Sequence, residues 1–248
     1  MAAKYLLIAQ SGGGKSMALS KLENAFVFYA DTKKRFPLKM PHANIYGYKE
    51  FSSVVGGKVV NNLPDKAIEY KGIKSFKSSM LSKLKAYKEV KGTYPSTVAF
   101  DTATNLYKMV NDHIKLSTKN VYGSHSNDTA LAMDEFLSWI ERTLVSVGIN
   151  VVFLAHAVVE PDTGIPRVAT SGSKSFEATG SFFGAFNYAS YLYIKDGMRL
   201  IAHKDLEYPH VCRNMLDVVE FEDALDFNIQ DMINKISEFE SEADDNVF

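Results

Sequence analysis

One glycine-rich stretch near the start of the chain carries the clearest chemistry. Residues 9–16 read Ala-Gln-Ser-Gly-Gly-Gly-Lys-Ser and match the spacing Gly-x-x-x-x-Gly-Lys-Ser/Thr, with Ala9 in place of the first glycine. In such loops the backbone N–H groups point inward at the β- and γ-phosphates of a nucleotide, and the helix that follows adds positive potential. The spacing therefore predicts a phosphate-binding loop made of Ser11, Gly12, Gly13, Gly14, Lys15 and Ser16.

The last two residues of this loop have distinct predicted roles. We expect the Lys15 ammonium to reach the β- and γ-phosphates and the Ser16 hydroxyl to hold Mg²⁺. Ala9 is the departure from the pattern, because alanine cannot adopt every backbone conformation that glycine can. The alternative is a chance Gly-Lys-Ser in a glycine-rich turn, and the apolar run before the loop with the helical pattern after it argues against that.

Three further polar residues each end an apolar run: Asp31, Asp101 and His156. The carboxyl ends of parallel strands line a common ligand crevice, so these side chains are expected near the phosphates. Asp101 is the predicted Mg²⁺ ligand, a role compatible with capping the helix that follows. His156 is predicted to sense the γ-phosphate, with a solvated strand end as the alternative. Asp31 is the best candidate for the residue that activates the attacking water, with a turn cap as the alternative.

The elements that must position these residues alternate along the chain. Continuous apolar runs predict buried strands over residues 4–9, 25–30, 97–100 and 150–155. Helical spacing of apolar residues predicts helices over 15–23, 102–117 and 130–147. Such alternation predicts an α/β fold, with a mainly parallel sheet and helices on both faces.

The remaining segments are less regular. Residues 188–195 and 198–203 predict a hairpin that turns at Asp196-Gly197, and Asn228 is expected to cap a final helix. Residues 37–70, an expected insertion, and 157–187 have no clear assignment, and loops of that length are commonly functional or disordered. We expect a domain over residues 1–216, followed by an acidic segment with one helix over 217–248.

Composition and charge narrow the class of protein. The 248 residues are 46% hydrophobic and 23% charged, which excludes disordered, collagenous and coiled-coil chains. With no membrane-length apolar run, no signal-like start and a single cysteine, Cys212, we expect a cytoplasmic protein without a membrane partner. The net charge of −1 hides an asymmetry: residues 217–248 hold eleven acids and one lysine, so the rest of the chain is basic. The acidic segment either aids solubility or competes with a polyanion for the basic body.

These motifs together resemble the RecA-like P-loop ATPases, most closely the compact phage ATPases that include single-strand annealing recombinases. The resemblance covers residues 4–204 and implies a RecA-like core with a C-terminal hairpin, using ATP and Mg²⁺ between neighbouring subunits of a ring or filament. It implies that Lys204 reaches a neighbour's γ-phosphate and that His156 occupies a sensor position where other members often have glutamine. It also places DNA-contacting loops at residues 157–187 and 117–129.

One departure bears on turnover. Relatives often carry Asp-x-Glu after the second strand, whereas this chain has Asp31-Thr32-Lys33. If that glutamate is the water-activating base, Lys33 replaces it, and hydrolysis is expected to be slow.

The basic and aromatic residues of the chain also indicate DNA binding, independently of the resemblance. Basic and aromatic side chains mix in one late segment, and bases stack on aromatic rings without regard to sequence. The candidates are Arg167, Lys174, Phe176, Phe182 and Phe183, although the phenylalanines could instead be core or subunit-contact residues. Residues 58–91 add nine lysines against three acids, which either bind phosphates or form a solvated helix surface.

The function that these expectations favour is ATP-dependent binding of single-stranded DNA, followed by strand annealing or pairing in phage recombination. A single-strand DNA-binding protein is a further expected partner. Two alternatives stay open: a motor or assembly ATPase with no nucleic-acid partner, and a nucleotide-gated structural or helicase-loading protein with little turnover.

Overall fold

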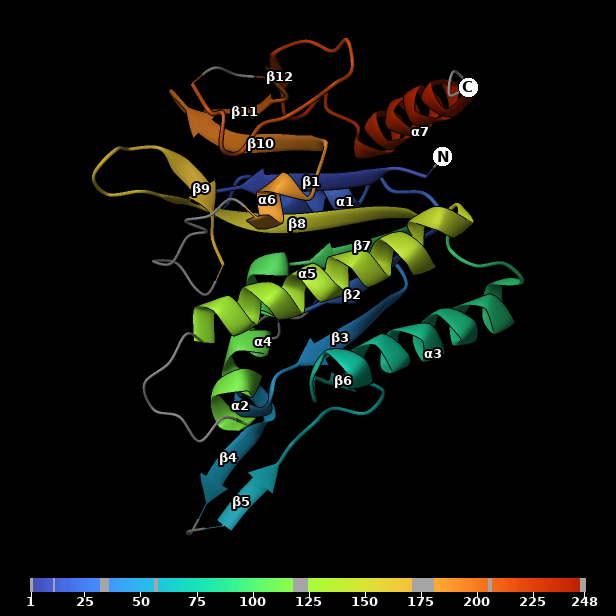
Figure 1. The fold of residues 1–248 in the computed structure, drawn as a ribbon, viewed down its shortest axis with the longest axis vertical. Helices are drawn as coiled ribbons and strands as arrows, with labels where there is room; N and C mark the ends of the chain where they lie inside the picture. Colours follow the sequence, from blue (N-terminus) through green and yellow to red (C-terminus); the bar gives the residue numbers. More distant parts are fainter. Residues whose placement is uncertain are drawn as a thin grey trace.

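A computed structural model describes residues 2–10, 12–31, 36–55, 58–117, 125–170, 181–204 and 207–245. Its centre is one large sheet with the strand order β12-β11-β10-β1-β8-β7-β2-β3-β6, with β9 paired to β8 (Figure 1). The strands are β1 (Lys4–Ala9), β2 (Ala25–Tyr29), β3 (His42–Tyr46), β6 (Ile68–Glu69), β7 (Thr97–Asp101), β8 (Asn150–Val159), β9 (Pro166–Val168), β10 (Tyr188–Lys195), β11 (Met198–Ala202) and β12 (Phe221–Asp223).

Neighbouring strands run parallel throughout the series β10, β1, β8, β7, β2, β3 and β6. At one edge, β11 pairs antiparallel with β10, and β12 pairs antiparallel with β11. Register brings the carboxyl ends of the central strands together: Ala9 is opposite His156, and Tyr29 is opposite Asp101. The α/β architecture predicted from the apolar runs is therefore confirmed.

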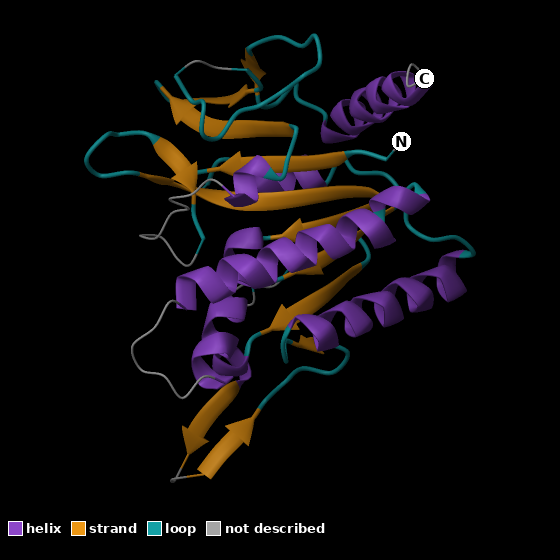
Figure 2. Ribbon diagram, viewed as in Figure 1, coloured by secondary structure: helices purple, strands orange, loops and turns teal. Residues whose placement is uncertain are grey.

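Each central strand buries both of its faces, as its continuous apolar sequence requires. In β1, Leu6 and Ile8 point to one face of the sheet while Tyr5 and Leu7 point to the other. The first face is covered by α3 (Ile73–Lys91), α4 (Ala103–Ser117), α5 (His125–Thr143) and α6 (Ser181–Gly184), and α3 and α5 cross the viewed side in Figure 2. The second face is covered by α1 (Lys15–Leu19) and α7 (Ile229–Asp245).

The acidic C-terminal segment packs into this core. Asn228 caps α7 by accepting a hydrogen bond from the Gln230 amide at 3.0 Å, as expected from the sequence. The apolar side of the helix, including Ile229, Ile233 and Ile236, is buried against the second face of the sheet. Helix α7 is therefore part of the core, and the acidic side chains that are exposed in this segment are Asp217, Glu220, Asp223, Asp226, Asp231, Glu238 and Glu242.

The segment over residues 37–70 extends the sheet. It contributes β3 and β6, then the short helix α2 (Tyr48–Phe51) and a separate two-stranded hairpin of β4 (Ser52–Val55) and β5 (Lys58–Asn61). Its apolar residues alternate with polar ones at short spacing, so no continuous run marks the strands in the sequence. Among the described residues, no helix is both long and apolar enough to span a membrane.

Candidate nucleotide-binding site

The glycines of the loop after β1 are required by its backbone. Gly12 and Gly14 have φ angles of 80° and 106°, in the left-handed region that disfavours other residues. At Gly13 a Cβ atom would lie 3.1 Å from the carbonyl oxygen of Gln10, so a side chain there would crowd the backbone. Ser11 lies outside the described residues.

Ala9 fits the first position of the motif without strain. It is the last residue of β1, paired with His156 on one side and Leu192 on the other, and is fully buried. An extended strand backbone is open to alanine, so this position does not require glycine.

The loop forms one wall of an open pocket of about 340 Å³ at the carboxyl edge of the sheet. The pocket gathers most of the residues predicted from the sequence, together with four that were not. It is lined by Gly12, Gly13, Gly14, Lys15, Ser16, Met17, Tyr29, Asp31, Pro37, Asp101, Thr102 and His156. Backbone amides, one lysine and two carboxylates around one space can hold a polyphosphate with a divalent cation.

Lys15 and His156 are in direct contact in this pocket. The Lys15 ammonium donates to His156 Nδ1 at 3.0 Å. The Lys15 side chain is buried, with 9% of its surface exposed, so its charge is held at the point that the phosphates would reach. The predicted sensor residue therefore contacts the predicted phosphate-binding lysine.

Asp101 provides a buried carboxyl group beside this lysine. Burial raises its pKa to about 6, an effect that Lys15 opposes and Asp31 reinforces. A carboxylate that costs free energy to ionise in place is stabilised by a cation at the same position. Asp101 and Ser16 therefore fit the part of a Mg²⁺ site that the protein supplies.

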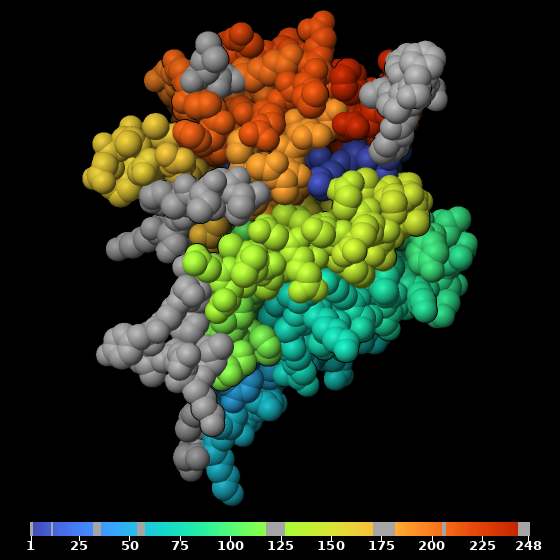
Figure 3. Space-filling view, viewed as in Figure 1, coloured from blue at the N-terminus to red at the C-terminus, as the bar shows by residue number. Residues whose placement is uncertain are grey.

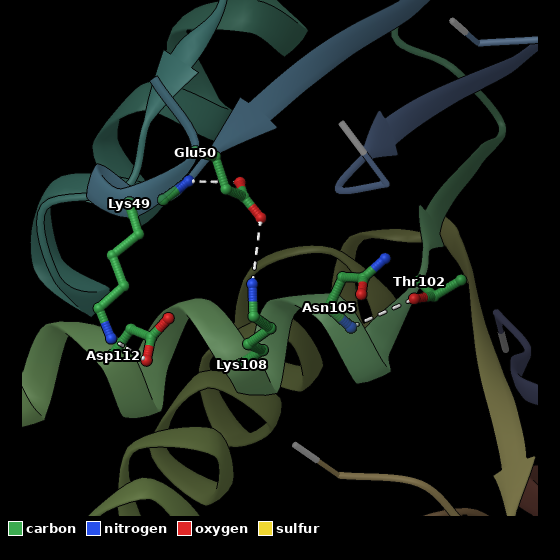
Figure 4. A network of polar contacts seen from close by, with 7 residues as sticks. Lys49, Glu50, Thr102, Asn105, Lys108 and Asp112 are labelled. Carbon is green, nitrogen blue, oxygen red and sulfur yellow. Dashed lines mark hydrogen bonds and ion pairs between the residues drawn. The ribbon is translucent and has the colours of Figure 1, made fainter. Parts of the chain in front are cut away.

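The residue that caps α4 is Thr102. Its hydroxyl oxygen accepts a hydrogen bond from the Asn105 amide at 3.2 Å (Figure 4). The capping role considered for Asp101 is thus carried out by its neighbour, and the Asp101 carboxyl faces the pocket.

Helix α4 also anchors α2 through two ion pairs (Figure 4). Lys49 Nζ lies 2.9 Å from Asp112 Oδ1, and Lys108 Nζ lies 3.7 Å from Glu50 Oε1. Glu50 also accepts a hydrogen bond from the Gly47 amide at 2.9 Å. Because β4 follows α2 directly, these contacts fix the base of the β4–β5 hairpin to a helix that begins beside Asp101.

Thr104 links the backbone of His156 to the chain beyond β9. The Thr104 hydroxyl accepts from the His156 amide at 2.9 Å and donates to the Ala169 carbonyl at 2.8 Å. The Ala169 amide in turn donates to the His156 carbonyl at 2.8 Å. These three hydrogen bonds hold the backbone of His156 against Ala169. No sequence pattern marks Thr104, because its partners are backbone groups from distant segments.

The residues proposed for DNA contact are placed differently from expectation. Phe182 and Phe183 are 0% and 6% exposed; Phe182 packs against Tyr107, and the Arg213 guanidinium lies over the Phe183 ring. Buried rings cannot stack on bases, so the prediction of base stacking by these two residues was wrong, and they are core residues. Lys174, Phe176 and Lys33 lie outside the described residues.

Two predicted basic residues lie away from the pocket lining. Arg167, on β9, pairs with Glu160 at 3.1 Å. Strand β11 runs antiparallel to β10, from Met198 opposite Lys195 to Ala202 opposite Tyr191, and so leads away from the pocket edge. Lys204 follows β11 and therefore lies toward the opposite edge of the sheet. Its contact with a neighbour's phosphate stays a prediction.

Comparison with known proteins agrees with this geometry. No curated protein matches the chain. A family model described as an AAA domain matches residues 1–178, a range that includes the glycine loop, Asp31, Asp101 and His156. With most of its length matched, and a P-loop nucleotide-binding pocket at the carboxyl edge of its sheet, the chain belongs to the AAA domain family.

Proposed function

We propose that this chain binds and hydrolyses ATP with Mg²⁺ and uses the nucleotide to control binding of single-stranded DNA, in recombination of the kind found in phages. The observation that carries the proposal is the contact between Lys15 and His156, together with the hydrogen bonds that connect His156 to Ala169. Residues 171–180, part of the segment expected to contact DNA, begin two positions beyond Ala169.

Different pocket residues bind the phosphates, hold Mg²⁺ and orient the attacking water. The glycine amides donate to the phosphate oxygens, and Lys15 exchanges the His156 nitrogen for a phosphate oxygen. Ser16 and Asp101 hold Mg²⁺, which when bound neutralises charge that develops on the phosphates. Asp31 lines the same pocket and is the candidate to orient the attacking water.

This exchange is the proposed switch. When Lys15 turns to phosphate, its hydrogen bond with His156 is broken, and the imidazole can turn toward the γ-phosphate. Its backbone hydrogen bonds with Thr104 and Ala169 carry any resulting shift into the segment after β9.

The test is ATP hydrolysis with and without single-stranded DNA, for the wild type and Lys15→Ala. We expect DNA-stimulated turnover in the wild type and a loss of at least about a hundredfold in the variant, since several kcal/mol of phosphate stabilisation disappear. Lys235→Ala, an exposed lysine on α7, is the matched control and keeps wild-type turnover. Turnover that is indifferent to DNA would favour a motor or assembly ATPase, and ATP-dependent DNA binding without turnover would favour a nucleotide-gated structural or helicase-loading protein.

Helix α3 supplies a second contribution to DNA binding. Lys74, Lys85, Lys88 and Lys91 are exposed on it, and none forms an ion pair within the described part of the chain. Lys88 lies 4.6 Å from the ring centre of Tyr94, which is 41% exposed. Because α3 leads into the amino end of β7, its last turns lie toward the edge opposite the nucleotide pocket.

Replacing Lys74, Lys85 and Lys88 by alanine is therefore expected to weaken DNA binding to a similar extent with and without ATP. Each lost phosphate contact lowers the slope of log affinity against log salt by about 0.7 for a single strand. Fluorescence anisotropy over a series of salt concentrations measures this slope. An unchanged slope would remove α3 from the DNA surface.

A further inference from the structure

The β4–β5 hairpin projects from the body of the protein. It lies at one end of the long axis in Figure 1 and forms a narrow extension in Figure 3. All residues of β5 are exposed, including Val59 at 58% and Val60 at 37%. A two-stranded hairpin with exposed valines gains little stability by itself, so this one is suited to packing against another surface.

The β12 strand forms an edge at the other end of the long axis (Figure 1). Within the described residues it pairs with β11 and has no strand on its other side. Three large apolar side chains beside this open edge are more than half exposed: Val219, Phe221 and Leu225. An open strand edge with exposed apolar residues is a template for pairing with another chain.

The edge is held rigidly in place. Glu222 of β12 lies 2.9 Å from Nε2 of the buried His203, whose Nδ1 lies 2.6 Å from the Ser190 hydroxyl on β10. An ordered edge has less conformational entropy to lose when a partner binds.

The charges of the two ends are complementary. Residues 217–226 hold five acidic residues and no basic one, and Asp217, Glu220, Asp223 and Asp226 form no ion pair within the described part of the chain. Residues 52–64 of the hairpin segment hold Lys58 and no acidic residue. Lys21 and Arg199 also lie beside Ala224 and Leu225, but the five acidic residues outnumber them. The edge therefore presents apolar side chains beside a net negative charge, opposite in sign to the hairpin.

We infer that the β4–β5 hairpin of one copy of this chain docks on the β12 edge of a second copy. The two surfaces differ and lie at opposite ends of one molecule, so the contact is head-to-tail and repeats to give a ring or a filament. Val59 and Val60 meet the apolar residues of the edge, and Lys58 meets its carboxylates. This inference adds the surfaces of self-association to the proposed function and does not depend on DNA.

The edge also adjoins the phosphate-binding loop. Ala224 and Leu225 line a small cavity together with Gly13 and Gly14, on the side of the loop away from Asp101. A neighbour docked on β12 would therefore cover a segment that touches the nucleotide site.

The test is sedimentation velocity of the full chain over a range of concentrations, without DNA and with or without Mg²⁺ and ATP. The wild type is expected to form species larger than a dimer. Val59→Asp and Phe221→Asp are each expected to be monomeric, while Leu131→Asp, at a residue of α5 that is 67% exposed, assembles like the wild type.

Mixing the two monomeric variants sharpens the test. One has an intact edge and the other an intact hairpin, so the mixture is expected to form one heterodimer and nothing larger. Lys58→Glu and Glu220→Lys change exposed charges and keep the apolar residues. Each is expected to weaken assembly alone, and mixing them restores it.

Three results would overturn the inference: a wild type that stays monomeric, a Val59→Asp or Phe221→Asp variant that assembles normally, or a Val59→Asp and Phe221→Asp mixture that stays monomeric. Equal melting temperatures exclude unfolding as the cause of a monomer. Lys15→Ala is expected to assemble without nucleotide, so a failure of ATP binding is distinguishable from a failure of docking.

Discussion

The protein contains two histidine clusters of similar composition in very different surroundings. In the pocket, His156 accepts a hydrogen bond from Lys15 beside the Asp101 carboxyl. In the β10–β12 region, the imidazole of His203 bridges Ser190 and Glu222. Each cluster combines an imidazole, a carboxyl group and a third polar partner.

The second cluster has the order of a nucleophilic triad, a hydroxyl, an imidazole and a carboxylate. However, Ser190 and His203 are both fully buried, so no substrate can reach the hydroxyl. The first cluster opens onto a pocket beside three glycines. Access and neighbouring backbone donors, more than residue types, separate a chemical site from a structural one.

Among variants of the two clusters, Asp101→Asn is expected to change turnover most. Loss of the carboxylate is expected to lower ATP turnover about a hundredfold or more, since a Mg²⁺ ligand contributes several kcal/mol in the transition state. The same change is expected to raise the free energy of unfolding at pH 8 by about 2–3 kcal/mol, because the buried carboxyl ionises only above its raised pKa of about 6.

Steady-state turnover and urea unfolding measure the two effects on one protein. Asp112→Asn, on α4 outside the pocket lining and paired with Lys49 of α2, is the control, with turnover unchanged and stability altered by less than about 1 kcal/mol. An Asp101→Asn variant that is less stable than the wild type would contradict the view that the buried, ionised Asp101 carboxylate destabilises the folded protein.

A smaller effect, on stability alone, is expected for His203→Ala. The variant leaves the buried Ser190 hydroxyl and the partly buried Glu222 without their partner, at a cost of about 3 kcal/mol. Turnover per folded molecule should stay at the wild-type value, as measured at a temperature where both proteins are folded. A loss of turnover in the folded variant would show that this cluster takes part in the chemistry.

The smallest effect concerns pH. Burial lowers the pKa of His203, with Glu222 opposing and Lys235 adding to the shift. As pH falls below about 6.5, His203 is therefore protonated in the unfolded chain before it is protonated in the folded protein. The folded state loses stability as pH falls from about 6.5 to the lowered pKa of His203.

The difference in unfolding free energy between the wild type and His203→Gln isolates this contribution. It is expected to shrink as pH falls from about 7.5 to about 5. Other groups, including Asp101, titrate in both proteins and cancel in the difference. A difference that stays constant over this range would mean that His203 is not held neutral by its surroundings.

Much of the fold could be predicted because the central strands are buried on both faces. Their sequences are continuous apolar runs, and the polar residue that ends each run marks the pocket edge. Asp31, Asp101 and His156 were found in this way, and the structure brings all three to the lining of one pocket.

The rest depended on packing that no local pattern records. Phe182 and Phe183 follow a polar segment and resembled loop residues, but the first face of the sheet buries them. The strands β3 and β6 alternate apolar and polar residues over few positions, so a turn-rich insertion was the natural prediction. Thr104 acts through backbone groups of β8 and the segment after β9, which only the folded chain brings together.

The burial of α7 against β1 has a consequence for the order in which the protein is made. The ribosome synthesises β1 first and residues 229–236 more than two hundred positions later, yet Ile229, Ile233 and Ile236 cover the face that carries Tyr5 and Leu7. Until α7 emerges, only α1 covers this side of the strand that leads into the phosphate-binding loop, so part of its apolar surface stays exposed. A nascent chain halted before α7 would therefore expose apolar surface of the kind that chaperones bind.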